Sequence, residues 1–203
     1  MRKVMTRLSL VAAVAVAVIA PLGTSNAQAA IQKSYSSGFF IGLGAEGDGL
    51  TTNQVGAAAE SGSGVGLVLG YGFSPQLSLY GQLSGAAMTS SAGDAYSLTH
   101  IDIGARVHFR TGPNIVVPFM QLGLTGRAVS ADDGGSTVTS SGGGVSLGGG
   151  LNAHFTPAVA LSAAVTWTLG DFDTFHVDKR SLPGYGVNAT TARVHLGLIW
   201  FPR

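Results

Sequence analysis

An alternation with a period of two residues constrains this chain more than any other feature. From Val159 to Leu169, every odd position is apolar and every even position is small or carries a hydroxyl group. Because successive side chains of a β-strand point to opposite faces, this segment has one large apolar face and one small, mildly polar face. The same alternation recurs in the segments 38–46, 64–73, 77–85, 100–110, 117–127, 145–155, 159–169 and 193–200. The sequence therefore predicts an all-β fold of eight strands.

The connections between these segments alternate between long and short. The short ones carry the turn signals Ser74-Pro75, Thr111-Gly112-Pro113-Asn114 and Thr156-Pro157. The long ones are 47–63, 86–98, 128–143 and 170–190, and they are rich in small and polar residues. Each predicted strand has roughly the ~9–11 residues that a tilted strand needs to cross a membrane. This pattern is typical of an antiparallel up-and-down transmembrane β-barrel with short periplasmic turns and long outer loops.

Residues 1–29 have the features of a cleaved signal peptide. Arg2, Lys3 and Arg7 precede the apolar stretch 8–20, and Ala27-Gln28-Ala29 fits a small-x-small cleavage site. The apolar stretch is shorter than the ~20 residues of a transmembrane helix. We therefore expect export of a barrel domain, residues 30–203, to the outer membrane of a Gram-negative-type bacterium.

Composition indicates which face of the barrel meets lipid. Charged residues make up 10% of the chain, against ~25% in an ordinary soluble domain. A soluble barrel with an apolar interior needs a charged exterior, whereas the small face of these strands is mostly Gly, Ser and Ala. Small residues suit the crowded interior of an eight-stranded barrel. We expect the apolar faces to contact acyl chains; a soluble exported barrel and another β fold are the alternatives.

Other features narrow the possible sites. The net charge of +1 gives no electrostatic case for nucleic acid, and the absence of cysteine excludes disulfides and thiolate metal sites. Aromatic residues on the apolar face predict a girdle at the membrane interface. Most lie near the short-turn end and one lies at the opposite rim: Phe39, Phe73, Phe109, Phe155 and Trp200, with Trp167 opposite.

Ionisable residues on the small face predict a charge network in the lumen. Buried charges need partners, so we interpret them as packing and charge-pairing groups of a filled barrel. The network comprises Glu46, Asp102, Arg106, Arg127, Arg193 and His195, and His108 and His154 share its face. Closure of the barrel puts Glu46 near Arg193. The hairpin of the fourth and fifth strands puts Asp102 near Arg127, and Arg106 is expected to cross the middle.

Two sharper interpretations of the polar residues stay open. Glu46, Asp102 and Arg106 would be the gate if the lumen were a solute path. Asp171, Asp173, His176 and Asp178 in the last long connection would serve a lipid-modifying enzyme or a loose metal site. Their spacing matches no helix-borne ligand motif, and loops collect polar residues anyway. We therefore expect no catalytic residue, no metal and no cofactor.

The leader, the four hairpins and the final strand together resemble the small eight-stranded outer-membrane barrels of the OmpA/OmpX type and the opacity-protein type. The motifs that carry the resemblance are Gly38-Phe39-Phe40-Ile41-Gly42-Leu43-Gly44, Gly70-Tyr71-Gly72-Phe73-Ser74-Pro75 and the alternating last strand. Members of that family usually end on an aromatic residue read by the barrel-insertion machinery, whereas Trp200-Phe201 is here followed by Pro202-Arg203.

We expect a monomer in outer-membrane lipid and lipopolysaccharide that has a structural or surface-interaction role. Its four long loops would contact host or envelope proteins, and a narrow porin-like channel is the alternative.

Overall fold

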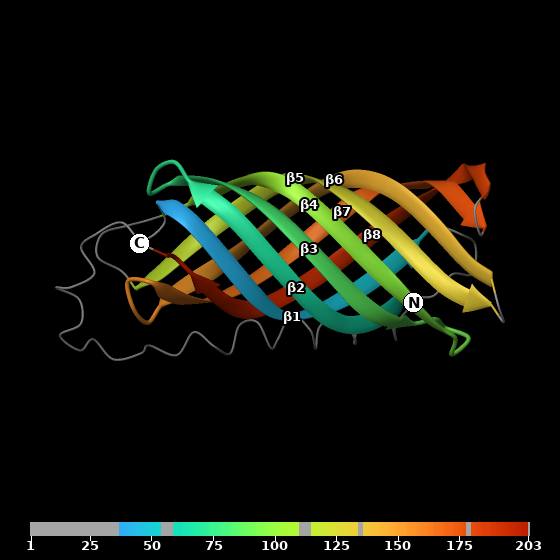
Figure 1. Ribbon diagram of the computed structural model, residues 1–203, viewed down its shortest axis with the longest axis horizontal. Coiled ribbons are helices and arrows are strands. Elements are labelled where there is room, and N and C mark those ends of the chain that lie inside the picture. Colours follow the sequence, from blue (N-terminus) through green and yellow to red (C-terminus); the bar gives the residue numbers. More distant parts are fainter. Residues whose placement is uncertain (1–36, 54–58, 110–114, 134–135, 178–179, 203) are drawn as a thin grey trace.

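The computed structural model describes residues 37–53, 59–109, 115–133, 136–177 and 180–202. The expected signal peptide, residues 1–29, lies outside this range. The eight strands are β1 (Gly38–Thr52), β2 (Glu60–Gly72), β3 (Leu77–Thr89), β4 (Ala95–His108), β5 (Val116–Asp133), β6 (Ser136–His154), β7 (Val159–Val177) and β8 (Arg180–Trp200). They pair in sequence order, all antiparallel, and β8 pairs back with β1 (Figure 1). The predicted eight-stranded up-and-down barrel is confirmed. Within the described residues, no helix has the length and apolar character needed to cross a membrane.

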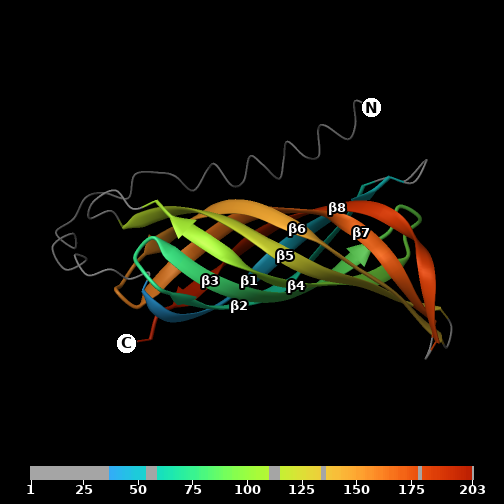
Figure 2. The same cartoon turned by 90° about the horizontal axis from the view of Figure 1, so that it is seen from above.

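The barrel has two ends that differ in structure. The start of β1, the end of β8 and the β2–β3 and β6–β7 connections lie at one end, at the left in Figures 1 and 2. We call this the terminal end and the opposite one the distal end. Because the strand number is even, the first and the last strand bring both ends of the described chain to the same side.

The strands are steeply tilted, and their registers show by how much. A row of register partners that starts at Phe39 on β1 passes through Tyr71, Leu79, Ala105, Leu122, Leu147, Trp167 and Ala192. Ala192 pairs with Gly49, so the row returns to β1 ten residues further along, from 39 to 49. Strand number and this stagger together fix the tilt and diameter of a barrel. With eight strands the interior is narrow enough for side chains to fill.

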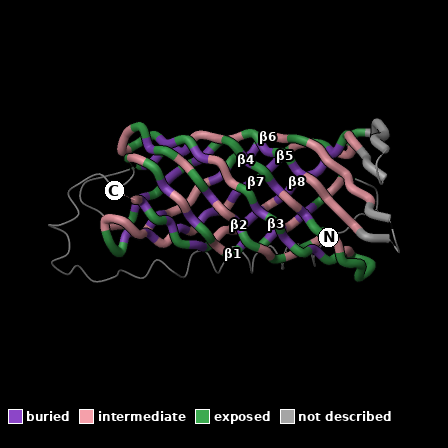
Figure 3. Tube along the Cα trace, viewed as in Figure 1, coloured by how far each residue is buried: buried purple, intermediate pink, exposed green. Residues whose placement is uncertain are grey.

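The apolar faces of the strands point outward. Leu43, Ile103 and Leu124 are 64%, 70% and 70% exposed, and large apolar side chains of all eight strands are exposed in the same way. Inward residues of the same strands are buried, so burial alternates along each strand in Figure 3. The leucines therefore form no central core, and the predicted orientation of the two faces is confirmed.

The aromatic residues of the predicted girdle all lie on the outer surface. Their exposed fractions run from 48% at Phe39 and Phe109 to 62% at Phe73. Those near the terminal end lie at or directly beside strand ends, and Trp167 lies well inside β7. Their function as an anchor at the membrane interface stays a prediction.

The prediction of four long loops was wrong. The distal connections span only 53–59, 90–94, 134–135 and 178–179, because the strands continue through most of the predicted loop residues. Glycine, serine and threonine suggested loops there, but inward residues such as Leu50 and Met88 are buried and their strands remain paired. The alternation of inward and outward residues therefore continues past the large apolar residues into segments of small and polar residues.

The distal end is also uneven. β5 pairs with β4 only as far as Ser130, and β8 pairs with β1 only as far as Ala189. Beyond these points β5, β6, β7 and β8 continue as a sheet, and the β7–β8 hairpin protrudes at the right of Figure 1. We call this part the tall half and the β1–β4 side the low half.

Inward glycines let large side chains lie against the barrel wall. A Cβ atom at Gly66 would overlap the carboxylate of Glu46, which projects from the neighbouring strand. A Cβ atom at Gly70 would overlap the ring of Phe40 in the same way. These glycines therefore fix how the lumen side chains of β1 are placed.

Candidate functional site

Buried apolar side chains form a cluster toward each end of the lumen. At the terminal end, one cluster of buried residues contains Phe40, Val68, Tyr80, Ala160, Ile199 and Phe201. At the distal end, another contains Leu50, Ala86, Met88, Leu98, Phe172 and Ala189. We call them the terminal cluster and the distal cluster. Charged and polar side chains fill the space between them and form the candidate site.

Charge in this space is balanced. The buried carboxylates among the described residues are Glu46, Asp48 and Asp102, and the buried guanidinium groups are Arg106, Arg127 and Arg193. Buried charges of one sign are costly unless the other sign accompanies them. The equal numbers of carboxylates and guanidinium groups therefore make a filled lumen possible, but these charges are not distributed evenly along it.

Arg193 on β8 lies at the centre of a set of side chains that includes the carboxylates of Asp102 and Asp48. Its Nη1 lies 2.7 Å from Asp102 Oδ2, across the lumen on β4, and it also donates to Ser84 Oγ at 3.3 Å. Thr125 donates a further hydrogen bond to Asp102. Asp48 is the register partner of Arg193 on β1, and its Oδ1 lies 3.8 Å from His100 Nδ1. This group connects the first, fourth and last strands through side chains.

Glu46 is held from two sides. Gln82 Nε2 donates to Glu46 Oε1 at 2.5 Å, and His195 Nδ1 lies 3.3 Å from the same oxygen. Glu46 and His195 are register partners across the β1–β8 interface. The carboxylate therefore joins β3, β1 and β8.

Arg106 is buried nearer the terminal end and has a different environment. Its Nε and Nη2 donate to Gln121 Oε1 at 3.2 and 2.9 Å. Its guanidinium carbon lies 4.1 Å from the ring centroid of Phe119 and 5.2 Å from that of Tyr80. Gln121 in turn donates to Thr166 Oγ1 at 2.9 Å. An amide oxygen and two aromatic faces, which attract cations, stabilise this charge.

Arg127 lies beneath the distal cluster. Its Nη1 donates to the carbonyl oxygen of Ala189 at 3.1 Å, and its guanidinium carbon lies 4.9 Å from the ring centroid of Phe172. Phe172 and Ala189 both belong to the distal cluster. The cluster is thus attached to the polar residues below it.

Neither predicted pairing forms a direct ion pair, although Glu46 and Arg193 line the same cavity, and the strand registers explain why. Arg193 faces Asp48 on β1, and Glu46 faces His195 instead. Asp102 faces Thr125 on β5, whereas Arg127 faces His100. Each expected pair is displaced by two residues, which is one inward position, and the long Arg193 side chain reaches Asp102 instead.

Sequence reasoning missed several members of the site. Asp48 was assigned to a loop, although Glu46, Asp48 and Leu50 continue the inward alternation of β1. The sequence analysis assigned no role to Gln82 or Gln121, and their amides bridge Glu46 and Arg106 to other strands. Uncharged amides give no charge signal, so only the register identifies them.

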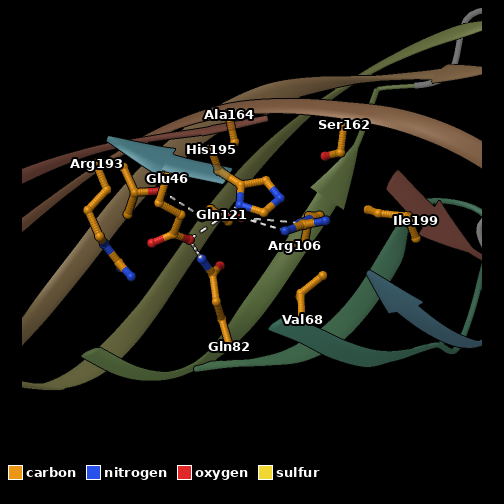
Figure 4. A pocket seen from close by; sticks show the side chains of 11 residues that line it. Glu46, Val68, Gln82, Arg106, Gln121, Ser162, Ala164, Arg193, His195 and Ile199 are labelled. Carbon is orange, nitrogen blue, oxygen red and sulfur yellow. Dashed lines mark hydrogen bonds and ion pairs between the residues drawn. The ribbon is translucent and has the colours of Figure 1, made fainter. Parts of the chain in front are cut away.

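The lumen contains a small cavity. This cavity of about 10 Å³ lies between the Glu46 and Arg106 levels, and Gln121 and Arg193 also line it (Figure 4). That is about the space that one water molecule needs.

The cluster predicted on the last long connection lies partly outside the described residues. Asp171 and Asp173 are exposed on β7. The His176 side chain and Asp178 lie outside the described residues. In the described part of the chain, no group of three or more His, Asp or Glu side chains is placed to hold a metal ion.

A comparison with protein families identifies the barrel. The family model described as "Outer membrane protein beta-barrel domain" matches residues 12–199. The chain belongs to this outer-membrane β-barrel family. The search of curated proteins gives no match.

Solved structures similar to this outer-membrane barrel support the same fold. Neisserial surface protein A gives a TM-score of 0.65 at 19% identity, covering 82% of this chain and 98% of that one. OprG from Pseudomonas aeruginosa gives 0.56 at 11% identity, covering 81% and 96%. Ail from Yersinia pestis gives 0.53 at 15% identity, covering 81% and 99%. At these identities the likeness extends to the fold.

Membership in this family gives the outward apolar surface its physical meaning. In a bilayer every backbone polar group needs a partner within the protein, and a closed barrel provides one for each strand. The exposed leucines, valines and isoleucines of this outer-membrane barrel are then its lipid-facing wall.

Proposed function

We propose that this protein is a closed, non-conducting outer-membrane barrel with a structural or surface-interaction role and no enzymatic activity. The observation that carries the proposal is the pair of buried apolar clusters, one toward each end, which would close the lumen. A polar solute would have to displace Phe40 and Phe201 at one end and Leu98 and Met88 at the other. Their exposed fractions are 6% or less.

The tall half is the interaction surface in this proposal. In the up-and-down barrels of outer membranes the short turns face the periplasm, so the terminal end would lie there and the distal end outside the cell. The β5–β6 and β7–β8 hairpins would then protrude furthest. Exposed side chains described on this half include Asp171, Asp173, Asn188 and Thr190. A partner would meet carboxylate, amide and hydroxyl groups.

Ail supports an interaction role for barrels of this fold. A structure of that protein, with a TM-score of 0.51 and 15% identity to this chain, contains the heparin analogue sucrose octasulfate. For this chain we propose a host or envelope protein, in addition to the surrounding lipid and lipopolysaccharide. Export through the signal peptide and assembly by the barrel-insertion machinery complete the proposal.

Conductance tests the closed lumen against the channel alternative. Purified protein in planar lipid bilayers is expected to give no unitary conductance steps. Removing side chains from the distal cluster, as in the double variant Met88→Ala, Leu98→Ala, is expected to increase leak. Ile103→Ala on the lipid-facing wall is the matched control and should behave as the parent. Reproducible steps in the parent protein would favour the narrow channel.

Epitope insertion tests the orientation. A tag between Ala92 and Gly93, in the exposed distal turn, is expected to bind antibody on intact cells. A tag after Pro75, in the β2–β3 turn at the terminal end, should bind only after the cells are opened. The reverse pattern would contradict a surface role for the tall half.

A further inference from the structure

The interface between β1 and β8 differs from every other interface of the barrel. Its strands are the first and the last of the chain, whereas all other neighbours are consecutive. Consecutive strands are joined by a connection that keeps them close, so their pairing costs little loop-closure entropy. The β1–β8 seam has no such connection, and it runs from Ile41↔Trp200 to Thr52↔Ala189. Closing it therefore requires stabilising contacts of its own.

Side chains of β8 supply such contacts at several levels of the lumen. His195 meets Glu46 of β1 at 3.3 Å, and Arg193 reaches Asp102 of β4 at 2.7 Å. At the terminal end, directly after β8, the ring of Phe201 lies 5.7 Å from the ring of Phe40. All of these groups are buried or nearly so. They link the last strand both to its neighbour and to the opposite wall.

These contacts differ in one respect from most other contacts of the lumen network; the bond from Arg127 to the carbonyl oxygen of Ala189, which also needs β8, is the exception. The bonds of Gln121 with Arg106 and with Thr166 join β4, β5 and β7, and Ser78 contacts His108 within the β3–β4 hairpin. Strands up to β7 are enough to form them. Asp102, in contrast, obtains its cationic partner only when β8 is in place.

The energetic consequence follows from burial. A carboxylate in the narrow, apolar-walled lumen is costly without a cation beside it. Before β8 arrives, Asp102 lacks the cation of Arg193 and Glu46 lacks its contact with the His195 ring. The favourable pairing energy is therefore released in the step that brings β8 against β1.

We propose that Arg193, His195 and Phe201 form a closure latch. The latch draws β8 into the seam and holds it there, so that the charges of the lumen act in barrel closure. This proposal is independent of whether the barrel conducts.

The native chain has no cysteine. A disulfide between two introduced cysteines therefore reports the formation of one chosen strand interface. Gly47→Cys with Val194→Cys spans the seam at a register pair on the outer face. Ser63→Cys with Ala87→Cys spans the β2–β3 interface in the same register row and is the matched control. Each protein is refolded from urea into phosphatidylcholine vesicles, and pulses of oxidant trap the disulfide at successive times.

The variant Arg193→Gln removes the central charge of the latch. We expect it to slow the seam disulfide at least fivefold and to leave the β2–β3 disulfide within twofold of the parent. Arg193→Lys keeps the positive charge and should restore most of the seam rate. A seam rate equal to the parent, or equal slowing at both interfaces, would overturn the latch.

Phe201→Ala provides a second measurement, because it keeps every lumen charge. It is expected to slow the seam selectively by a smaller factor, about twofold to threefold. If Arg193→Gln does not refold at all, this variant decides alone: parent-like seam closure in Phe201→Ala would then contradict the proposal.

Discussion

Arg193 and Arg106 are buried in the same lumen by two different means. Arg193 lies 2.7 Å from the carboxylate of Asp102. Arg106 has no carboxylate within 4.0 Å among the described residues; it bonds to an amide oxygen and lies over the face of Phe119. The first arrangement stabilises a charge with an opposite charge, and the second with dipoles and a ring quadrupole.

The difference between the Arg193 and Arg106 sites shows which buried charges depend on each other. An ion pair is coupled, because removing either member leaves a buried charge alone. A guanidinium on neutral partners is not coupled in this way, since its removal leaves only an amide oxygen without a donor. Substitutions at Arg193 and its partners should therefore destabilise the protein more than substitutions at Arg106 and its partners.

Asp102→Asn is the strongest test of this comparison. The substitution keeps the shape of the side chain and removes the charge that pairs with Arg193. Breaking a buried pair from one side costs about 3–5 kcal/mol, and we expect a loss of that size in the free energy of unfolding. A urea titration of the protein in phospholipid vesicles, read by gel mobility, measures it.

An exposed carboxylate provides the control for that test. Asp94→Asn lies in the distal turn and should change the free energy of unfolding by less than about 0.5 kcal/mol. If Asp102→Asn behaved like Asp94→Asn, the carboxylate would be dispensable and the contrast between the two guanidinium groups would disappear.

How far the sequence predicted these sites depends on what alternation can show. Alternation assigns each residue to a face, so it placed Glu46, Asp102, Arg106 and Arg193 in the lumen without reference to their partners. It carries no information on register, and a shift of one inward position gave Glu46 and Asp102 other partners than expected. Register is set by the turns and by packing against neighbouring strands, which only the folded chain displays.

The distal ends of the strands show a second limit of sequence reasoning. Gly47, Ser141 and Thr190 are residue types that are common in loops. They occupy strand positions because neighbouring strands provide their hydrogen bonds, and buried residues such as Leu98 fill the lumen behind them. Local composition was overridden by tertiary pairing, which is usual for β-structure.

Gly66→Ala tests how the barrel wall positions the Glu46 side chain, without removing any charge from the lumen. A Cβ atom at Gly66 would overlap the Glu46 carboxylate, which has to move away from Gln82 and His195. Overpacking of this kind costs about 1–3 kcal/mol, and the same urea titration measures it. Gly47→Ala faces outward with no atom within 4 Å of the added carbon and should be nearly neutral. Equal effects of the two substitutions would show that Glu46 is not held in place by the wall.

The smallest expected effect concerns the aromatic faces around Arg106. In a double-mutant cycle, Arg106→Met and Phe119→Leu should show a coupling of about 1 kcal/mol, which lies within the range of cation–π contacts. The control cycle combines Phe119→Leu with Arg193→Met, which lies at the other level and should couple by less than about 0.5 kcal/mol. Because a cycle cancels the cost of each single change, it isolates the contact of the guanidinium with the ring. Equal coupling in both cycles would mean that Phe119 senses the total charge of the lumen, and the distinction between a paired and a stacked guanidinium would then fail.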